Sequence, residues 1–267
     1  GEAAYIHEPS GYLHLATRQL FRTPRQLQDG PFTNYWHDIK IHKADGDVEF
    51  KPVNTAARWA NWPYRRTHAG ISYAPGEPHV THNDEYNTWR GWGAQPVAGD
   101  VQPFVDLFDH VFAGVDDAHR EWLWQWLAYP IQHPGTKLYT AVMVHGRAQG
   151  TGKSFIGYIM GDIYGRRSNF SKVNQSDLFG DFNEWIANKQ FVLGEEITGG
   201  DKRVGADKLK DLISNEIIRV KKKYQAEYQV PDCANYWLTS NQPNALYLED
   251  DDRRFFVHRL EHQQNLE

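Results

Sequence analysis

The stretch HGRAQGTGKSF, residues 145–155, holds the residue types that bind phosphate groups. A glycine-rich turn lets backbone N–H groups approach an anion, a lysine reaches the outer phosphates and a hydroxyl binds Mg²⁺. The strict form of this loop has a glycine five places before its last glycine, where this chain has Arg147, and Gly146 stands one place too early. The half that would touch phosphate is intact. We therefore expect ATP to bind through Gly150, Thr151, Gly152, Lys153, Ser154 and Phe155.

Two acidic residues follow a second apolar run, FVLGEE, residues 191–196. An ATPase needs a carboxylate beside Mg²⁺ and a base that activates the attacking water. We expect Ser154 and Glu195 to bind Mg²⁺ and Glu196 to be the base. Both glutamates should lie at the carboxyl end of a strand next to the strand that precedes the loop. Two glutamates that cap a surface strand are the alternative.

Three further polar residues stand at the ends of later strands. Asn241 ends the apolar run YWLTSN, where it could contact both the γ-phosphate and water, although Ser-Asn after a strand is also an ordinary turn. Arg253 and Arg254 begin RRFFVHRL, and an arginine there could stabilise transition-state charge in the site of a neighbouring subunit. The alternative is that both arginines pair at the surface with the acidic residues 250–252.

A basic segment lies between the acidic pair and Asn241. Its run KKKY, residues 221–224, falls where two strands would turn, and basic residues beside an aromatic ring suit the backbone of a single strand of nucleic acid. A solvated charged face would give the same pattern. The eight basic residues are Lys202, Arg203, Lys208, Lys210, Arg219, Lys221, Lys222 and Lys223.

Alternating strands and helices must position these residues. Strands are predicted at 138–146, 169–173, 190–197, 234–241 and 253–260, helices at 154–165, 176–189 and 205–216, and a hairpin at 217–230. This alternation predicts an α/β fold with a mostly parallel sheet and helices on both faces.

The chain before residue 136 has a different character. Residues 104–111 and a segment from Asp116 have helical spacing, and Pro130 and Pro134 should end the second helix. Residues 1–100 are rich in aromatic residues and turn signals, and WANWPYRRTHAGISYAPGEP predicts short strands joined by turns. We expect three parts: an α+β region at 1–100, a helical segment at 101–135 and an ATPase core at 136–267. Tryptophans that could stack bases, or simply pack in the core, are Trp59, Trp62, Trp89 and Trp92.

The composition limits the possible functions. Forty per cent of the 267 residues are hydrophobic, which excludes a disordered chain, and a net charge of -5 confines any nucleic-acid site to a local patch. The single cysteine, Cys233, excludes an internal disulfide and fits a reducing compartment such as the host-cell cytoplasm. No apolar run approaches the roughly 20 residues of a membrane helix. The segment GEAAYIHEPS lacks the features of a signal peptide.

Together these residues resemble the superfamily 3 helicases, and most closely the helicase modules of phage primase-helicases and primase-polymerases. The resemblance rests on five motifs in family-like order and spacing: GTGKS, VLGEE, LISNEIIRVKKKYQAEYQVPD, LTSN and DDDRRFFV. They cover about residues 136–260. The resemblance implies a P-loop NTPase fold of the AAA+ type, assembled as a hexameric ring that moves along single-stranded DNA.

The resemblance also implies roles for single residues. Lys153 matches the Walker A lysine, and Glu195 and Glu196 match the Walker B pair, although many relatives have Asp in place of Glu195. Asn241 matches the sensor asparagine, and one of the tandem arginines matches the arginine finger. The tip of the DNA-contacting hairpin falls near Lys221, Lys222, Lys223 and Tyr224.

The sequence therefore predicts an ATP-dependent DNA helicase or translocase module of a viral replication protein, with ATP and Mg²⁺ as cofactors. Its expected partners are single-stranded DNA, further copies of the chain, and a primase or polymerase domain on the same parent protein. A P-loop nucleotide or metabolite kinase is the alternative enzyme, and DNA would not change its turnover. A non-catalytic ring that holds ATP and binds DNA is the alternative outside enzymes. A packaging motor would bring a nuclease with clustered acidic residues, which the sequence lacks.

Overall fold

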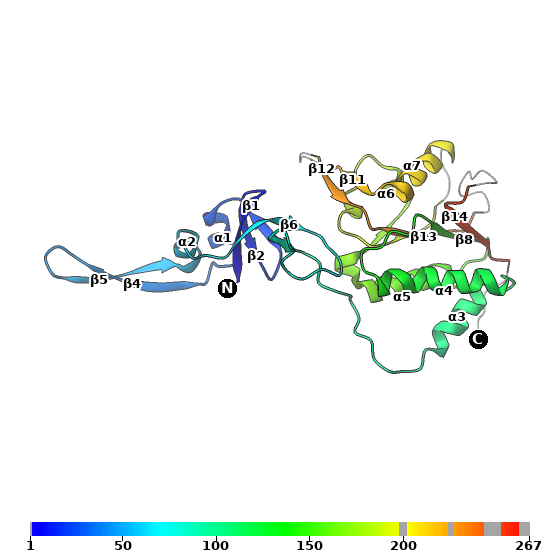
Figure 1. The fold of residues 1–267 in the computed structure, drawn as a ribbon, viewed down its shortest axis with the longest axis horizontal. Coiled ribbons are helices and arrows are strands. Elements are labelled where there is room, and N and C mark those ends of the chain that lie inside the picture. Colours follow the sequence, from blue (N-terminus) through cyan, green and yellow to red (C-terminus); the bar gives the residue numbers. More distant parts are fainter. Residues whose placement is uncertain (1, 198–201, 224–226, 243–251, 262–267) are drawn as a thin grey trace. The chain divides into compact units, whose positions relative to one another are not determined.

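The chain consists of two units, residues 1–89 and residues 90–267 (Figure 1). The helices of the predicted segment 101–135 pack within the second unit. The computed structural model describes residues 2–197, 202–223, 227–242 and 252–261, and residues 202–204 by their backbone alone. Among the described residues, no helix combines the length and the apolar character needed to cross a membrane.

A five-stranded parallel sheet forms the centre of the second unit, in the order β14-β8-β13-β10-β9. The predicted parallel sheet is confirmed. However, β13 separates β8 from β10, so the prediction that the acidic pair follows a neighbour of the loop strand is wrong. The reason is burial: all six residues of β13 are buried, which suits a strand at the middle of a sheet. The strands are β8 (Ala141–His145), β9 (Phe170–Val173), β10 (Phe191–Gly194), β13 (Asn235–Ser240) and β14 (Phe255–Arg259).

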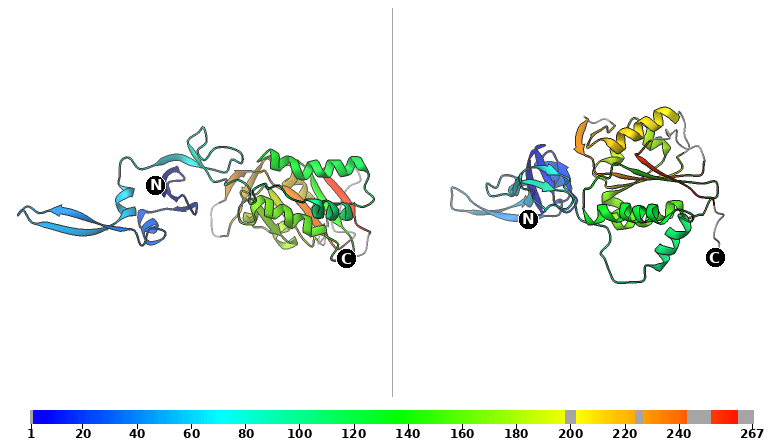
Figure 2. Two further views of the ribbon diagram at one scale, coloured as in Figure 1. Left: turned by 90° about the horizontal axis from the view of Figure 1, so that it is seen from below. Right: turned by 45° about the vertical axis from the view of Figure 1, so that its right-hand side comes forward.

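Helices cover both faces of this sheet, as predicted (Figure 2). Residues alternate between the faces, so Val142 and Val144 of β8 point to one core, and Ala141 and Met143 point to the other. Covering both faces explains why the strands are continuous apolar runs rather than alternating ones. The first face carries α3 (Gln102–Val111), α4 (Asp117–Gln132) and α5 (Lys153–Tyr164), and the second carries α6 (Gln175–Phe179) and α7 (Lys202–Ser214).

Helix α4 continues through Pro130 and ends at Gln132, so the prediction that Pro130 stops the helix is wrong. A proline inside a helix removes one hydrogen bond and strains the preceding turn. Packing outweighs this cost here, because Pro130 lies on one buried stripe with Leu123, Trp126 and Leu127, at helical spacing. The chain leaves the helix at His133, just before Pro134.

The helix predicted at 176–189 is also wrong for most of its length. Helix α6 ends at Phe179, and Gly180 adopts an extended conformation before a short 3₁₀ turn, η2 (Glu184–Ile186). Asn183, which lies between α6 and η2, hydrogen-bonds the backbone of a segment further along the chain. Its amide Nδ2 donates to the carbonyl of Arg219 at 3.0 Å, and its Oδ1 accepts from the backbone N–H of Lys221 at 2.7 Å.

The strands that Asn183 holds form the predicted hairpin, which is confirmed. Strand β11 (Ile217–Val220) pairs antiparallel with β12 (Tyr228–Pro231), with Val220 opposite Tyr228. Ile218 and Val220 are buried in the core on the second face of the sheet, so the base of the hairpin is part of that core. Tyr224, at the predicted tip, lies outside the described residues.

The first unit has its own five-stranded sheet, in the order β3-β2-β1-β6-β7. The prediction of strands through the WANWPYRR segment is wrong at its start, because Trp59 and Ala60 end helix α2 (Thr55–Ala60). Asn54 caps this helix by accepting from the backbone N–H of Ala56. The strands are β1 (Ala3–Glu8), β2 (Gly11–His14), β3 (Gln19–Phe21), β6 (Thr67–Ser72) and β7 (Glu85–Asn87), and the other helix is α1 (Pro24–Asp29).

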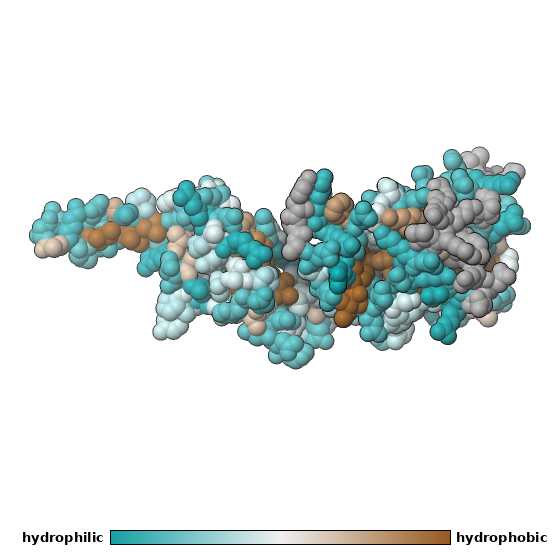
Figure 3. Space-filling model, turned by 90° about the horizontal axis from the view of Figure 1, so that it is seen from above, coloured by the Kyte–Doolittle hydropathy of each residue, from teal (hydrophilic) through white to brown (hydrophobic). Residues whose placement is uncertain are grey.

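A long two-stranded hairpin projects from this sheet. Strand β4 (Trp36–His42) pairs antiparallel with β5 (Val48–Asn54) over seven residue pairs. Apolar side chains run along it, and Phe50 is 64% exposed (Figure 3). An isolated two-stranded hairpin is only marginally stable in water. Its base is nevertheless supported, because Asn54 begins α2 and hydrogen-bonds the carbonyl of Phe32 at 2.8 Å.

Candidate nucleotide-binding site

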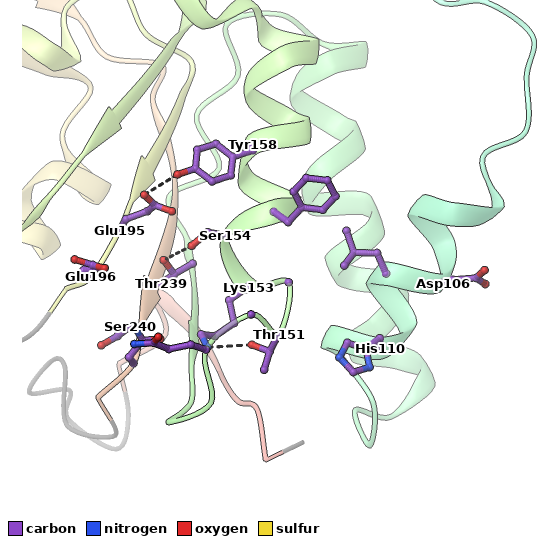
Figure 4. A pocket seen from close by; sticks show the side chains of 16 residues that line it. Asp106, His110, Thr151, Lys153, Ser154, Tyr158, Glu195, Glu196, Thr239 and Ser240 are labelled. Atoms are coloured by element: carbon purple, nitrogen blue, oxygen red, sulfur yellow. Dashed lines mark hydrogen bonds between the residues drawn. The ribbon is translucent and has the colours of Figure 1, made fainter. Parts of the chain in front are cut away.

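A cleft of about 700 Å³ opens at the carboxyl ends of β8, β10 and β13 (Figure 4). Figure 4 shows Ser154, Tyr158 and Glu195 gathered on one side, with His110 of α3 across the loop. In open α/β sheets, the carboxyl ends of the strands are where ligands bind. The cleft brings together these predicted site residues: Gly150, Thr151, Gly152, Lys153, Ser154, Phe155, Glu195, Glu196 and Asn241.

The loop that lines the cleft depends on two glycines with positive φ. Gly150 has φ +69° and Gly152 has φ +85°, a region that side chains disfavour. A Cβ on Gly152 would also lie 2.7 Å from Cδ1 of Leu107. The following residue, Lys153, begins α5, and its carbonyl accepts a 3.0 Å hydrogen bond from the indole of Trp237. The loop therefore exposes backbone N–H groups at the start of a fixed helix.

The displaced glycine, Gly146, has a packing role. A Cβ there would lie 2.5 Å from the carbonyl oxygen of Leu260. The N–H of Gly146 donates to the carbonyl of Ser240 at 3.1 Å, and the N–H of Leu260 donates to the carbonyl of His145 at 2.7 Å. Gly146 thus lets the chain pass tightly between the ends of β13 and β14, and its position does not alter the turn at 150–152.

Lys153 is held by neutral groups. Its Nζ donates to the carbonyl of Ala148 at 2.6 Å and to Oγ1 of Thr151 at 3.0 Å. In the described part of the chain no carboxylate pairs with it, and burial lowers the pKa of its ammonium group. A buried cation without a counter-ion is an arrangement that an anion would stabilise.

Glu195 has three partners. Its Oε2 accepts from the hydroxyl of Tyr158 at 2.8 Å and forms an ion pair with Nζ of Lys172 at 2.6 Å. Burial raises the pKa of the Glu195 carboxyl, but the hydrogen bonds from Lys172, Tyr158 and Ser154 outweigh burial and hold the pKa below its usual value. The hydrogen bonds that Lys172 makes, first to Glu195 and then to Tyr158, raise the pKa of Lys172 to about 12. Glu195 is therefore ionised near neutral pH.

The other polar groups of the cleft are less constrained. Glu196 is exposed and has φ +54°, so the chain turns sharply after Glu195 and sends the two side chains in different directions. The hydroxyls of Ser154 and Thr239 lie 3.1 Å apart. Asn241 directly follows β13 at the rim of the cleft.

The tandem arginines lie away from the cleft. The carbonyl of Arg254 accepts from the N–H of Ala141, so both arginines precede β14 at the amino ends of the strands. Nε of Arg254 pairs with Oδ1 of Asp252 at 2.9 Å, and Lys210 pairs with the same carboxylate at 3.3 Å. Burial raises the pKa of Asp252, but hydrogen bonds from Arg254 and Lys210 more than offset it and lower the pKa overall. Arg253 is exposed, and no described group pairs with it.

The predicted DNA-binding lysines also lie apart from the cleft, directly after β11. Lys221 lies 3.8 Å from Oε1 of Glu227, and Lys222 lies 3.2 Å from Oε2 of Glu184. These pairs are exposed, and exposed pairs contribute little and exchange readily for other anions.

The sequence interpretation missed several residues of the cleft. Tyr158 stands one helical turn beyond Ser154, so helical spacing could have identified it. Lys172, which lies outside the lining but pairs with Glu195, is on β9 opposite Leu193, and only the strand order brings it there. Asp106, Leu107 and His110 come from α3, which no local pattern connects to the loop.

The oxygen groups of the cleft suit a hard cation. The lining includes the hydroxyls of Ser154 and Thr239 and the carboxylates of Asp106, Glu195 and Glu196, and Mg²⁺ prefers oxygen ligands completed by water and substrate phosphates. Among the described residues, no group of three His, Cys, Asp or Glu side chains could hold a metal ion alone.

Comparisons with known proteins agree with part of the prediction. Residues 144–254 match a family of unknown function, DUF5906. The chain is 27% identical over 157 residues to the DNA Primase-polymerase of Nitratiruptor phage NrS-1, which covers 57% of this chain and 21% of that protein. This chain therefore spans about a fifth of that relative's length.

Solved structures of the NrS-1 C-terminal region share the fold. The A form of its apo structure has a TM-score of 0.64 at 21% identity, and the match covers 84% of this chain and 56% of that chain. An apo structure of residues 305–718 also has a TM-score of 0.64, at 20% identity, and the match covers 90% and 62% of the two chains. The chain is thus related, at low identity, to a phage DNA primase-polymerase and shares the fold of its C-terminal region.

Proposed function

We propose that residues 90–267 bind ATP with Mg²⁺ and hydrolyse it to move single-stranded DNA through a ring of copies of this chain. One observation supports this most. A glycine-rich loop with a lysine and a serine, an acidic pair and an asparagine converge in one cleft at the ends of β8, β10 and β13. An ATPase needs these groups together.

Each group would have one task. The N–H groups of residues 150–154 and the ammonium of Lys153 would bind the phosphates, and Lys153 would leave the carbonyl of Ala148 to do so. Ser154 and Glu195 would hold Mg²⁺, which supplies charge neutralisation on the phosphates. Glu196, exposed and turned away from Glu195, would accept a proton from the attacking water.

The arginine finger would come from a second copy of the chain. Arg253 and Arg254 precede β14, and the five residues of β8 separate that end of the sheet from the loop by roughly 16 Å. Neither arginine can reach the cleft of its own chain across that distance. Arg254 is held by Asp252, whereas Arg253 is exposed, so we assign the finger to Arg253.

The DNA would contact the β11–β12 hairpin. In the described residues, the ion pairs of Lys221 and Lys222 are exposed and can exchange for phosphates, and Asn183 fixes the start of the turn that carries them. The related phage protein is named a DNA Primase-polymerase, which favours DNA as the substrate to test first.

The test is the rate of ATP hydrolysis with and without single-stranded DNA, together with the native mass. We expect stimulation by DNA and an oligomeric mass. Lys153→Ala and Glu196→Gln should each abolish hydrolysis. Lys43→Ala is the control: Lys43 lies in the turn of the β4–β5 hairpin of the first unit, and its loss should leave hydrolysis unchanged. A monomer whose turnover ignores DNA would indicate a kinase, and full DNA-dependent function in Glu196→Gln would indicate a non-catalytic ring.

The finger assignment has its own test. Lys153→Ala and Arg253→Ala are each expected to be inactive, but mixing them should restore part of the activity, because some interfaces would then join an intact cleft to an intact finger. Arg254→Ala should instead lower the free energy of unfolding, since it leaves Asp252 with Lys210 as its one described cation. If the mixture stays inactive, Arg253 does not act between subunits.

A further inference from the structure

A second cleft, of about 1110 Å³, lies within the first unit between the β4–β5 hairpin and α2. The hairpin supplies an apolar wall with Ile39 and Val53, and α2 and the turn after it supply Arg58, Trp59 and Trp62. Nothing in the proposed ATPase cycle uses this cleft. Its lining suggests a ligand, because it combines flat aromatic surface with unpaired positive charge.

The aromatic part of the cleft is exposed and held in place. Trp62 is 51% exposed and Tyr64 is 82% exposed, and their rings meet edge to face at 6.2 Å. The turn that carries Trp62 is fixed, since its N–H donates to the carbonyl of Trp59 at 3.0 Å and Pro63 follows. Trp59, in contrast, packs on the core of the unit and against Tyr12. A rigid, solvent-facing tryptophan offers a stacking surface at little cost in conformational entropy.

The positive charges of the cleft lie beside that surface. Nη1 of Arg58 donates to Nε2 of His37 at 3.1 Å, and Nδ1 of this neutral imidazole then donates to Oγ1 of Thr55 at 3.3 Å. In the described part of the chain no carboxylate pairs with Arg58 or Lys40. Asp38 is the one carboxylate among the residues that line the cleft, beside the basic side chains of Arg58 and Lys40.

We propose that this cleft binds single-stranded nucleic acid, with a base stacked on Trp62 and a backbone phosphate at Arg58. Trp62 follows Arg58 by four residues, in the turn just past the end of α2 at Ala60, and both line the cleft, so one strand could place a base and a phosphate against them together. Basic grooves with exposed aromatic rings are the usual means of binding single strands without sequence preference. An acidic peptide would satisfy Arg58 and Lys40 but would leave the tryptophan without a planar partner.

The test uses the full chain, without ATP, and fluorescence anisotropy of a short fluorescein-labelled oligothymidylate. Lys221, Lys222 and Lys223 are first changed to alanine, so that the β11–β12 hairpin does not contribute and a failure of the proposed ATPase would not affect the result. In this background Trp62→Ala should weaken binding roughly fivefold to 150-fold, the range for losing one base–aromatic stack. Trp62→Phe, which keeps a flat ring, should retain most of the affinity.

Matched controls separate the cleft from a general loss of stability. Trp36→Ala removes another exposed tryptophan of the same unit, outside the cleft, and should leave the affinity within twofold. Arg58→Ala should lower the slope of log affinity against log salt by about 0.7, the value for one phosphate contact with a single strand. Arg25→Ala, on α1, should not change the slope.

Photocrosslinking provides an independent readout. An oligonucleotide that carries bromouracil should form adducts on Trp62 or Tyr64. Adducts confined to residues 217–231, or equal losses of affinity in Trp62→Ala and Trp36→Ala, would overturn the proposal.

Discussion

Alanine at Gly146 and alanine at Gly152 should both destabilise the fold but should differ in their effect on nucleotide binding. The added Cβ of Gly146→Ala would lie 2.5 Å from a backbone carbonyl oxygen, which cannot rotate away. The added Cβ of Gly152→Ala would meet a side-chain carbon of Leu107 at 2.7 Å and would occupy a residue with φ +85°. The first change strains the packing behind the loop, and the second strains the loop itself.

The two costs are similar in size. Overfilling a packed site costs about 1–3 kcal/mol, so Gly146→Ala should lower the free energy of unfolding by that amount. A side chain in the left-handed region costs roughly 1–2 kcal/mol, and Leu107 can shift to relieve part of the contact in Gly152→Ala. Stability alone would therefore not separate the two variants, whereas nucleotide affinity would.

Urea unfolding and binding of a fluorescent ATP analogue measure the two properties. At temperatures where Gly146→Ala remains folded, its affinity for the analogue should be within about threefold of the parent, because the change strains packing behind the loop and not the loop itself. The affinity of Gly152→Ala should fall by tenfold or more. Gly99→Ala is the matched control, since a Cβ there meets nothing within 4 Å. The reasoning is refuted if Gly146→Ala is as stable as the parent but no longer binds the analogue.

Two further predictions concern ion pairs of the second unit. Lys137→Met should lower the free energy of unfolding in urea by about 3–5 kcal/mol, because it leaves the carboxylate of Asp232, 1% exposed, without its cation. Burial already raises the pKa of Asp232, so the loss should shrink as pH falls towards 3.8, and Asp232→Asn should restore part of the stability. Lys172→Met should raise the pKa of Glu195, which keeps its burial and loses its strongest hydrogen bond. The acidic limb of the pH–rate profile for ATP hydrolysis should then move towards neutral pH, and Tyr158→Phe should move it less; an unchanged limb in both would contradict this role.

The sequence predicted the elements of the second unit well where local pattern determines them. Apolar runs of four to six residues gave buried strands because helices cover both faces of the sheet. Local pattern failed where packing outweighed propensity. Pro130 stays inside α4 because its stripe is buried. Helix α6 ends at Phe179, Gly180 is extended, and Asn183 then hydrogen-bonds the β11–β12 hairpin.

The sequence could not predict which strands are neighbours, and the composition of the site depends on this. Spacing along the chain says nothing about the insertion of β13 between β8 and β10. The strand order also brings Lys172 to Glu195 and sends Arg253 to the end of the sheet away from the loop. The predicted loop, acidic pair and asparagine do meet in one cleft, and their roles in hydrolysis stay predictions until they are measured.

The charge of the cleft bears on the proposal that a second copy of the chain supplies an arginine. Among the described residues that line it, Lys153 is the one lysine or arginine, while Asp106, Glu195 and Glu196 are three carboxylates. Phosphoryl transfer spreads charge over the equatorial oxygens, and an added arginine typically accelerates it by about 10³–10⁵. Lys172 does not line the cleft, and its Nζ is bound to Glu195 and to the hydroxyl of Tyr158. Under the proposed function, this arginine would be Arg253, which no described group pairs with, and it would come from a second copy of the chain whose amino sheet end is set against this carboxyl end.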